Sequence, residues 1–210
     1  MELYSTPASP FARKVRVLIH ETGQDQAVKI TDVAITPIIP NGDLVRHNPA
    51  GKVPTLVTDD GQAILDSRVI CEYLDNRHAG EKMFPADGTA RWRALTAQAL
   101  GDAIMDAGVL IRYEQVTRPR EFFWQGWQQA QAGKALRIVA SLEDQAEKFG
   151  SKINVGMIAV GCALSYLDFR FPDTIAWRDG HPGLADWYER FAERPSMQAT
   201  ALLDPNEATR

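Results

Sequence analysis

Two short stretches carry residues whose types and spacing could bind a small anionic ligand. In the first, Val53-Pro54 leads into an apolar segment, where proline is unusual because it gives a β-ladder no N–H donor. In the second, Asp66-Ser67 opens a helical pattern with an acid and a hydroxyl, which satisfy or complement free N–H groups at a helix N-terminus. Together they could present backbone hydrogen bonds and an anion site to a small, extended ligand.

The elements that must position these stretches alternate between strand and helix. Short apolar or alternating segments predict four strands, over residues 1–4, 27–33, 54–58 and 62–65. Apolar residues at helical spacing predict two helices, over residues 10–22 and 67–77, the first with Ser9 as N-cap and Pro10 as first residue. Residues 34–49 contain three prolines and are predicted to be mostly loop. The order, β-α-β-β-β-α, is that of an α/β thioredoxin-like domain.

The remainder of the chain is predicted to be all-helical. Residues 79–88 contain Gly80, Pro85 and Gly88 and suit a linker between domains. Apolar periodicity then predicts four helices, over residues 89–118, 121–149, 154–171 and 182–193. We therefore expect a thioredoxin-like domain at residues 1–78, the linker at 79–88 and an all-α domain at 89–210.

Composition and charge argue against several classes of protein. Hydrophobic residues make up 45% and charged residues 24% of the 210 residues, close to ordinary globular usage. A formal net charge of −4 gives no general attraction to nucleic acid or to an anionic membrane, and no apolar run is judged long enough to span a bilayer. No signal peptide is recognised, and Cys71 and Cys162 are interpreted as reduced, buried thiols. We expect a cytoplasmic enzyme or binding protein without a metal, and neither nucleic acid nor membrane as partner.

Three motifs occur in order on matching elements and resemble a known family. They are Ser9-Pro10-Phe11 at the first helix, Asn48-Pro49-x-Gly51-Lys52-Val53-Pro54 before the third strand, and Asp66-Ser67 before the last helix of the first domain. With these motifs the sequence resembles the cytosolic glutathione transferases, and the resemblance covers nearly the whole chain. It looks most like bacterial members that have Ser-Pro-Phe where omega-type members have Cys-Pro-Phe, with zeta-like members as further relatives.

The resemblance implies a site for glutathione, a short peptide with a carboxylate at each end and a central thiol. The peptide bond before Pro54 is then cis, and Val53 turns its N–H and C=O towards the cysteinyl backbone of the ligand. Ser67 binds the γ-glutamyl carboxylate, Asp66 contacts the γ-glutamyl ammonium group, and Lys52 reaches the glycyl carboxylate. The alternatives are helix capping by Asp66 and Ser67 and a merely solvated Lys52.

Ser9 stands at the family's catalytic loop position, so the resemblance makes it the group that stabilises the glutathione thiolate. Its hydroxyl and the free N–H groups of Phe11 and Ala12 could donate hydrogen bonds to the sulfur, and the helix dipole favours the anion. Arg13 could also approach the sulfur. Capping alone is one alternative for Ser9, and another is that Ser5, Thr6 or Tyr4 acts on the thiol in its place. No cysteine occurs in this loop, which puts a mixed-disulfide mechanism in doubt.

The helical domain of the family supplies the pocket for the second substrate. Four residues along the first long predicted helix could face this pocket: Met105, Asp106, Val109 and Tyr113. Packing in the core or at an interface is the alternative for each of them.

The resemblance implies a transferase that conjugates glutathione, or adds it reversibly, to small electrophilic substrates. It also implies a homodimer and a role in detoxification. One alternative is a non-catalytic binding or regulatory protein on the same fold. Another is a glutathione-dependent isomerase, although the Ser-Ser-Cys loop of zeta-type relatives is absent. Function resides in the site, so the fold alone does not separate these activities.

Overall fold

The computed structural model describes residues 1–150 and 152–204, which form two compact units. The first unit contains residues 1–86 and the segment from Pro195 onward, and the second contains Asp87–Arg194. This grouping differs from the predicted domains at the C-terminal end, because helix α8 (Pro195–Ala199) packs on α1 (Pro10–Glu21). The hydroxyl of Ser196 donates to the carboxylate of Glu21, which ties the two helices together.

A four-stranded sheet organises the first unit. The strands are β1 (Glu2–Ser5), β2 (Lys29–Asp32), β3 (Thr55–Val57) and β4 (Ala63–Ile64), in the order β2-β1-β3-β4. Strands β1 and β2 are parallel, whereas β3 is antiparallel to β1 and to β4. Tyr4 lies opposite Thr55, and Leu56 lies opposite Ile64. The start of β3 is therefore next to the end of β1, where the chain turns into α1.

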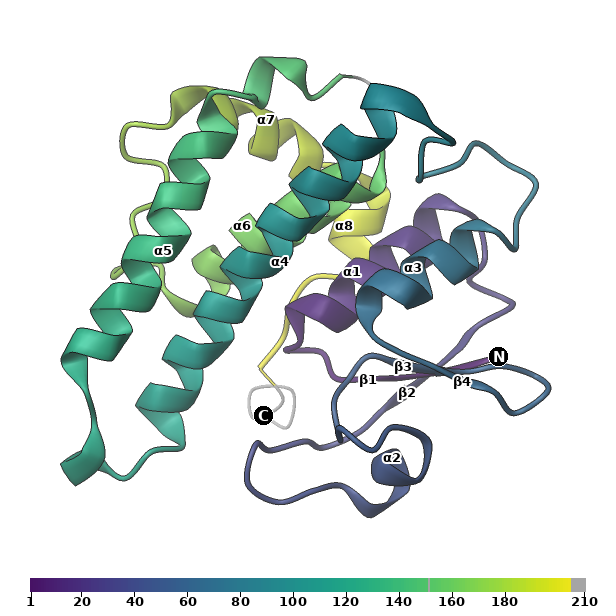
Figure 1. Cartoon of the computed structure of the whole chain (residues 1–210), viewed down its shortest axis with the longest axis horizontal. Coiled ribbons are helices and arrows are strands. Elements are labelled where there is room, and N and C mark those ends of the chain that lie inside the picture. Colours follow the sequence, from purple (N-terminus) through teal and green to yellow (C-terminus); the bar gives the residue numbers. More distant parts are fainter. Residues whose placement is uncertain (151, 205–210) are drawn as a thin grey trace. The chain divides into compact units, whose positions relative to one another are not determined.

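Helices α1 and α3 (Ser67–Asp75) cover one face of this sheet (Figure 1). The core between them consists of fully buried apolar side chains from both layers, including Leu3, Leu18, Leu56 and Leu74. The α/β thioredoxin-like fold predicted from the sequence is confirmed. The apolar face of each helix and the inward residues of β1 and β3 provide its buried surface.

One helix of the first unit was not predicted. Residues 34–49 were expected to be mostly loop, but α2 occupies Gly42–His47. Asn41 begins it, because its side chain accepts hydrogen bonds from the N–H groups of Asp43 (3.1 Å) and Leu44 (3.0 Å). Prolines flank this short helix rather than interrupt it, so the rest of the segment is loop as predicted and proline content alone did not reveal α2.

The second unit is helical, as predicted. Its helices are α4 (Gly88–Val116), η1 (Arg120–Phe122), α5 (Gln125–Glu143), η2 (Ala146–Lys148), α6 (Val155–Arg170) and α7 (Pro182–Ala192). The long helix predicted over residues 121–149 is thus divided into three. The side chain of Glu114 explains why α5 starts later than predicted. Its carboxylate accepts a hydrogen bond from the N–H of Trp124 at 2.9 Å and holds the residue that precedes α5. This hydrogen bond is the main reason that the pKa of Glu114 lies below its ordinary value.

Glycines allow α4 and α6 to pack backbone to backbone. A Cβ at Gly101 would lie 2.7 Å from the carbonyl carbon of Ala159, and one at Gly156 would lie 2.5 Å from the carbonyl oxygen of Ala94. Real Cβ atoms do not approach backbone this closely. The absence of a side chain at both positions therefore sets the distance between the two central helices.

Helix α4 is also long and apolar enough to cross a membrane, which the sequence analysis did not anticipate. Among the described residues it is the one such helix, with a mean hydropathy of 1.3 over 18 residues. However, 56% of that window is buried inside the structure, and α4 packs against α6 and α5. Core helices of soluble proteins pass the same test, so packing in the core accounts for the composition of α4.

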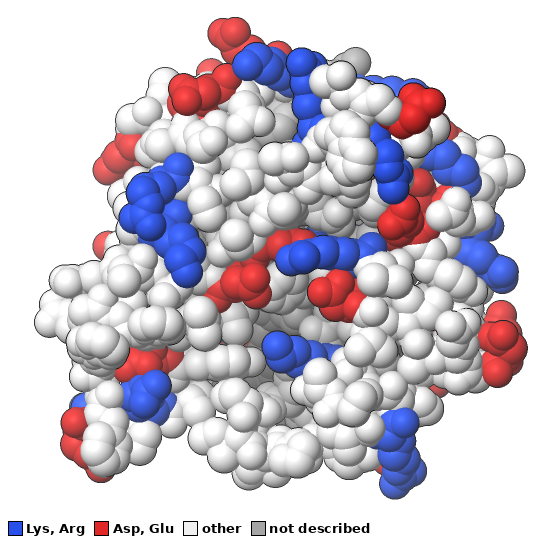
Figure 2. Space-filling view, in the orientation of Figure 1, with Lys and Arg blue, Asp and Glu red and all other residues white. Residues whose placement is uncertain are grey.

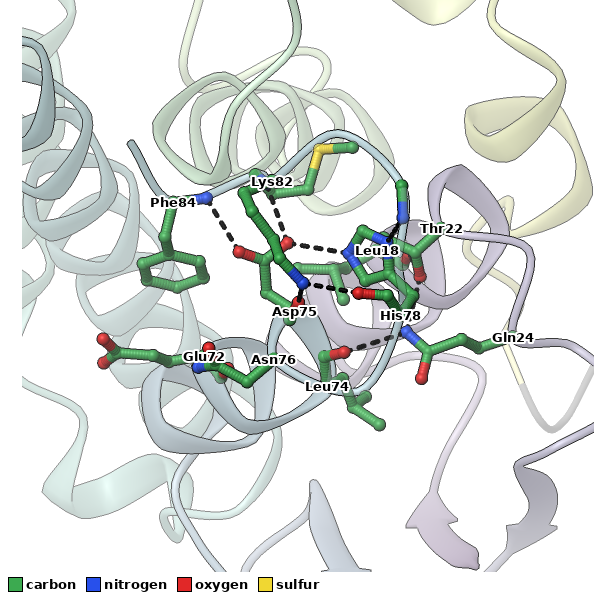
Figure 3. A network of polar contacts seen from close by, with 12 residues as sticks. Leu18, Thr22, Gln24, Glu72, Leu74, Asp75, Asn76, His78, Lys82 and Phe84 are labelled. Atoms are coloured by element: carbon green, nitrogen blue, oxygen red, sulfur yellow. Dashed lines mark hydrogen bonds and ion pairs between the residues drawn. The ribbon is translucent and has the colours of Figure 1, made fainter. Parts of the chain in front are cut away.

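A buried carboxylate, that of Asp75, fixes the segment that follows α3 (Figure 3). Its oxygens accept hydrogen bonds from the N–H groups of Met83 (2.7 Å) and Phe84 (3.1 Å), and Oδ1 lies 3.0 Å from Nε2 of His78. Because the N–H of Gly80 donates to Nδ1 of His78 at 3.1 Å, Nε2 carries the proton that is donated to Asp75. The predicted linker is therefore held by hydrogen bonds over much of its length.

Asp75→Asn is expected to lower the free energy of unfolding by about 2 kcal/mol, because the new amide turns a donor towards an N–H group that then has no acceptor. Urea unfolding followed by circular dichroism measures this change. Asp43→Asn is the matched control: Asp43 is 3.4 Å from Arg46 in a surface pair, and its loss should change stability by less than about 0.5 kcal/mol. Equal effects of the two substitutions would contradict the role assigned to Asp75.

Candidate functional site

The N-terminus of α1 presents a serine with a proton to donate. Ser9 is the N-cap of this helix, and its Oγ accepts a hydrogen bond from the N–H of Ala12 at 3.2 Å. A hydroxyl that accepts in this way keeps its own hydrogen for another acceptor. The N–H of Phe11 has no partner among the described residues and is a second donor. Ala12, which was predicted as a free donor, is bound by Ser9 instead.

Arg13 is engaged away from the Ser9 loop. Its Nη2 donates to the C=O of Met197 at 3.0 Å, and its Nε lies 3.4 Å from Oγ1 of Thr200. The side chain is buried, contrary to the usual position of arginine on a helix. Farther along α1, burial lowers the pKa of Arg16. The hydrogen bonds of Arg13 join α8 and the residue that follows it to α1.

The loop before β3 presents the main chain of Val53. The Val53–Pro54 bond is cis. Within the described ranges, neither the N–H nor the C=O of Val53 has a hydrogen-bond partner, although the residue is buried. The neighbouring Lys52 is exposed. An N–H and a C=O that lie free side by side are what an extended peptide needs in order to add on as a strand.

The N-terminus of α3 presents a second free group. Asp66 is its N-cap, and the side chain accepts from the N–H of Arg68 at 2.9 Å. The Leu65–Asp66 bond is also cis. Ser67 is only 3% exposed, and its hydroxyl and N–H have no partner in the part of the chain that the structure describes. A hydroxyl and an N–H without a partner at a helix N-terminus are suited to bind an anion.

The sheet brings these groups to one edge. Ser9 follows the end of β1, Pro54 precedes the start of β3, and Ser67 follows the end of β4. Because β3 is antiparallel to both β1 and β4, the start of β3 lies beside both of these ends. The three groups predicted from separate motifs thus belong to one region of the first unit.

The sequence analysis assigned no role to two further residues of this region, although one of them opens the second motif. Asn48 and Thr55 are buried and hydrogen-bond to the C=O of Lys52, each at 2.9 Å. The available signal was an asparagine and a threonine on either side of a turn that contains Gly51 and Pro54. The sequence does not show that their side chains converge on one carbonyl.

The four residues proposed for the second substrate all lie on α4, but they differ in burial. Met105 is fully buried, whereas Asp106 is exposed and Tyr113 is 36% exposed. Burial raises the pKa of the Tyr113 phenol above its ordinary value. A hollow of about 270 Å³ within the helical unit is lined by other residues: Phe149, Gly150, Met157, Trp187, Arg190, Phe191 and Arg194. The assignment of the four residues on α4 stays a prediction.

Two family descriptions match the sequence. Residues 3–82 match "Glutathione S-transferase, N-terminal domain" and residues 125–190 match "Glutathione S-transferase, C-terminal domain". The chain is 33% identical to YibF, an uncharacterized GST-like protein of Escherichia coli (strain K12), over 95% of this chain and 98% of the relative. The chain belongs to the glutathione S-transferase family.

Solved structures of bacterial relatives have the same fold. A glutathione transferase family member from Pseudomonas fluorescens Pf-5, with bound glutathione, is 47% identical, with a TM-score of 0.94 over 97% of this chain and 99% of that one. A glutathione S-transferase from Methylobacillus flagellatus KT, with glutathione bound, is 32% identical, with a TM-score of 0.85 over 96% and 99%. The resemblance predicted from three motifs is confirmed.

Charged side chains of both signs and the polar donors at the sheet edge describe the chemistry of the surface. On the face shown in Figure 2, acidic and basic side chains are interspersed rather than gathered into one patch. Within residues 1–150 and 152–204, no group of three or more His, Cys, Asp or Glu residues is placed to hold a metal ion. The donors at the sheet edge are hydroxyl and backbone groups, which suit a small peptide.

Proposed function

We propose that the protein binds glutathione and transfers its thiolate to small electrophilic substrates. The observation that carries this proposal is the unpartnered, 3% exposed Ser67 at the α3 N-terminus, in the same region as the free N–H and C=O of Val53. Polar groups that have no partner within the described chain are available to bind a ligand. A γ-glutamyl carboxylate would supply acceptors for Ser67, and a cysteinyl backbone would supply both partners for Val53.

The solved relatives support this proposal. The Pseudomonas fluorescens protein binds glutathione, and a second structure of that family member contains S-(propanoic acid)-glutathione. The second structure is 46% identical to this chain, with a TM-score of 0.90 over 97% of this chain and 100% of that one. A bound thioether of glutathione is the kind of product that conjugation to a small electrophile would give.

In the proposed reaction, the chain lowers the pKa of the glutathione thiol and holds the peptide. Ser9 and the N–H of Phe11 donate to the sulfur, which favours the thiolate, and the thiol proton leaves to solvent. Asp66 contacts the γ-glutamyl ammonium group, and Lys52 contacts the glycyl carboxylate. The thiolate then forms a C–S bond with the electrophilic carbon, and the leaving group departs with its electron pair. In a reversible addition no group leaves: the π electron pair of the attacked double bond moves away from the carbon and takes up a proton from solvent.

Calorimetric titration with glutathione, followed by turnover assays with a panel of electrophiles, tests the proposal. We expect saturable binding, and conjugation of at least one electrophile. Absence of binding at millimolar glutathione would overturn the proposed function. Binding without turnover would favour the non-catalytic alternative, and isomerisation without conjugation would favour the isomerase. The homodimer and the cytoplasmic location also stay predictions, and light scattering measures the first of them.

Ser67→Ala is expected to weaken glutathione binding about tenfold, because a charge-assisted hydrogen bond to the γ-glutamyl carboxylate is lost. Calorimetry measures the change. Ser196→Ala is the matched control, since Ser196 is another buried serine of the same unit and its hydroxyl already donates to Glu21. If both variants kept the affinity of the wild type, Ser67 would be only the first residue of a helix.

A further inference from the structure

One peptide group in the loop before β3 is held by two side chains at once. The C=O of Lys52 accepts a hydrogen bond from Nδ2 of Asn48 at 2.9 Å and another from Oγ1 of Thr55 at 2.9 Å. Asn48 Nδ2 also donates to Thr55 Oγ1 at 2.9 Å, and Asn48 Oδ1 accepts from the N–H of Ala50 at 2.9 Å. Asn48 is 2% exposed and Thr55 is fully buried. The two side chains therefore form a closed, fully bonded cluster around this carbonyl.

The cluster determines where the adjoining N–H points. The C=O of Lys52 and the N–H of Val53 belong to the same planar peptide group, which is not one of the cis bonds found in the described residues. In a trans peptide group these two bonds point in opposite directions. Because the C=O is directed at Asn48 and Thr55, the N–H of Val53 is directed away from them, and there it has no partner within the described chain.

Two donors on one carbonyl have a second effect. Hydrogen bonds in a chain polarise one another, so an amide whose C=O accepts twice becomes a better N–H donor. Holding the peptide plane before the ligand arrives also reduces the conformational entropy that binding must remove. Both effects act on the one backbone donor that the proposed site offers to the cysteinyl carbonyl of glutathione.

We propose that Asn48 and Thr55 are positioning residues for glutathione, acting through the Lys52–Val53 peptide group. The inference rests on the proposed function and deepens it. Neither side chain contacts the ligand in this scheme. They orient and polarise the N–H of Val53, and they leave the sulfur, Ser9 and the thiol pKa unaffected.

Thr55 offers a matched pair of substitutions. Thr55→Val removes the hydroxyl at nearly constant volume, whereas Thr55→Ser keeps it. Calorimetry with S-methylglutathione, which has no ionisable thiol, measures recognition of the peptide alone. We expect Thr55→Val and Asn48→Ala to weaken binding about tenfold, and Thr55→Ser to stay within twofold of the wild type. In turnover assays, KM for glutathione should rise while kcat and its pH profile stay unchanged.

Thr58→Val controls for simple loss of a buried threonine in the same hairpin. Thr58 accepts from the N–H of Gln62 at 3.0 Å and lies at the other end of β3, so its loss should lower stability without changing affinity. A second measurement needs no variant: the amide proton of Val53 in the wild type should move downfield when S-methylglutathione binds. It reports on the inference even if a variant fails to fold.

The outcomes distinguish a failure of the positioning role from a failure of the proposed glutathione binding. If the wild type binds neither glutathione nor S-methylglutathione, the proposed function fails. If the wild type binds but folded Thr55→Val and Asn48→Ala bind equally well, or the Val53 amide does not respond, only the positioning role fails. A change in kcat or in the thiol pKa would place the cluster at the sulfur and would likewise overturn it.

Discussion

Ser9→Ala is expected to lower turnover about a hundredfold and to raise the pKa of the bound glutathione thiol, while glutathione affinity stays within a few-fold of the wild type. The Ser9 hydroxyl has a hydrogen that the helix does not use, since its oxygen accepts from Ala12. Removing a donor aimed at a developing or resident anion typically costs two to three orders of magnitude in rate. Steady-state kinetics and the pH dependence of thiolate absorbance measure both effects.

The capping role of Ser9 requires its own control, because Ser9→Ala also removes an N-cap worth about 1 kcal/mol. Asn154→Ala removes the N-cap of α6, whose side chain accepts from Gly156 at 2.9 Å, and should lower stability without reducing turnover comparably. Ser9→Thr keeps both cap and hydroxyl and should retain most of the activity. Unchanged turnover and thiol pKa in Ser9→Ala would leave Ser9 as a cap alone.

Gly101→Ala is expected to lower the free energy of unfolding by about 3 kcal/mol. The added Cβ would lie 2.7 Å from the carbonyl carbon and 2.8 Å from the carbonyl oxygen of Ala159, which are backbone atoms that no rotamer change can move. The strain of forcing α4 and α6 apart outweighs the gain of up to about 1 kcal/mol that alanine brings to a helix interior. Urea unfolding measures the difference.

Gly133→Ala is the matched control for this substitution. Gly133 lies in the interior of α5, and a Cβ there would meet only Nη1 of Arg137, at 3.4 Å, the far end of a flexible side chain. Because the added Cβ meets no backbone atom, the higher helix propensity of alanine should dominate, and the free energy of unfolding should rise by up to about 1 kcal/mol. We expect the free energy of unfolding to fall in Gly101→Ala and to rise in Gly133→Ala. Changes of the same sign would refute close packing as the role of Gly101.

Local signals predicted helix starts well, even where the stabilising contact is distant. Helix α7 begins at Pro182, the first residue of the predicted helix, and proline is favoured at this position. Its N–H groups at Gly183 (2.9 Å) and Leu184 (2.7 Å) are nevertheless satisfied by Glu143, 40 residues earlier in the chain. No spacing rule could have found that acceptor, because the fold alone brings it there.

In the candidate site, too, short motifs were informative whereas tertiary contacts could not be predicted. The types and order of Ser9, Val53 and Ser67 were sufficient to propose candidate ligand-binding groups, because they depend on motifs a few residues long, and their roles stay predictions. The surroundings of these groups depend on tertiary packing. Arg13 was considered as a neighbour of the thiol on charge alone, yet its bonds reach the last turn of the described chain at Met197 and Thr200.

The return of α8 to α1 has a consequence for how the protein is made. The first unit draws residues from both ends of the chain, since Leu203 also donates to the C=O of Pro7 at 3.3 Å. During synthesis from the N-terminus, the sheet and the helix capped by Ser9 emerge early, but the segment that packs on α1 emerges only after the helical unit. The first unit therefore becomes complete only after the entire helical unit has left the ribosome, and it is not separable by a cut at the connection after α3.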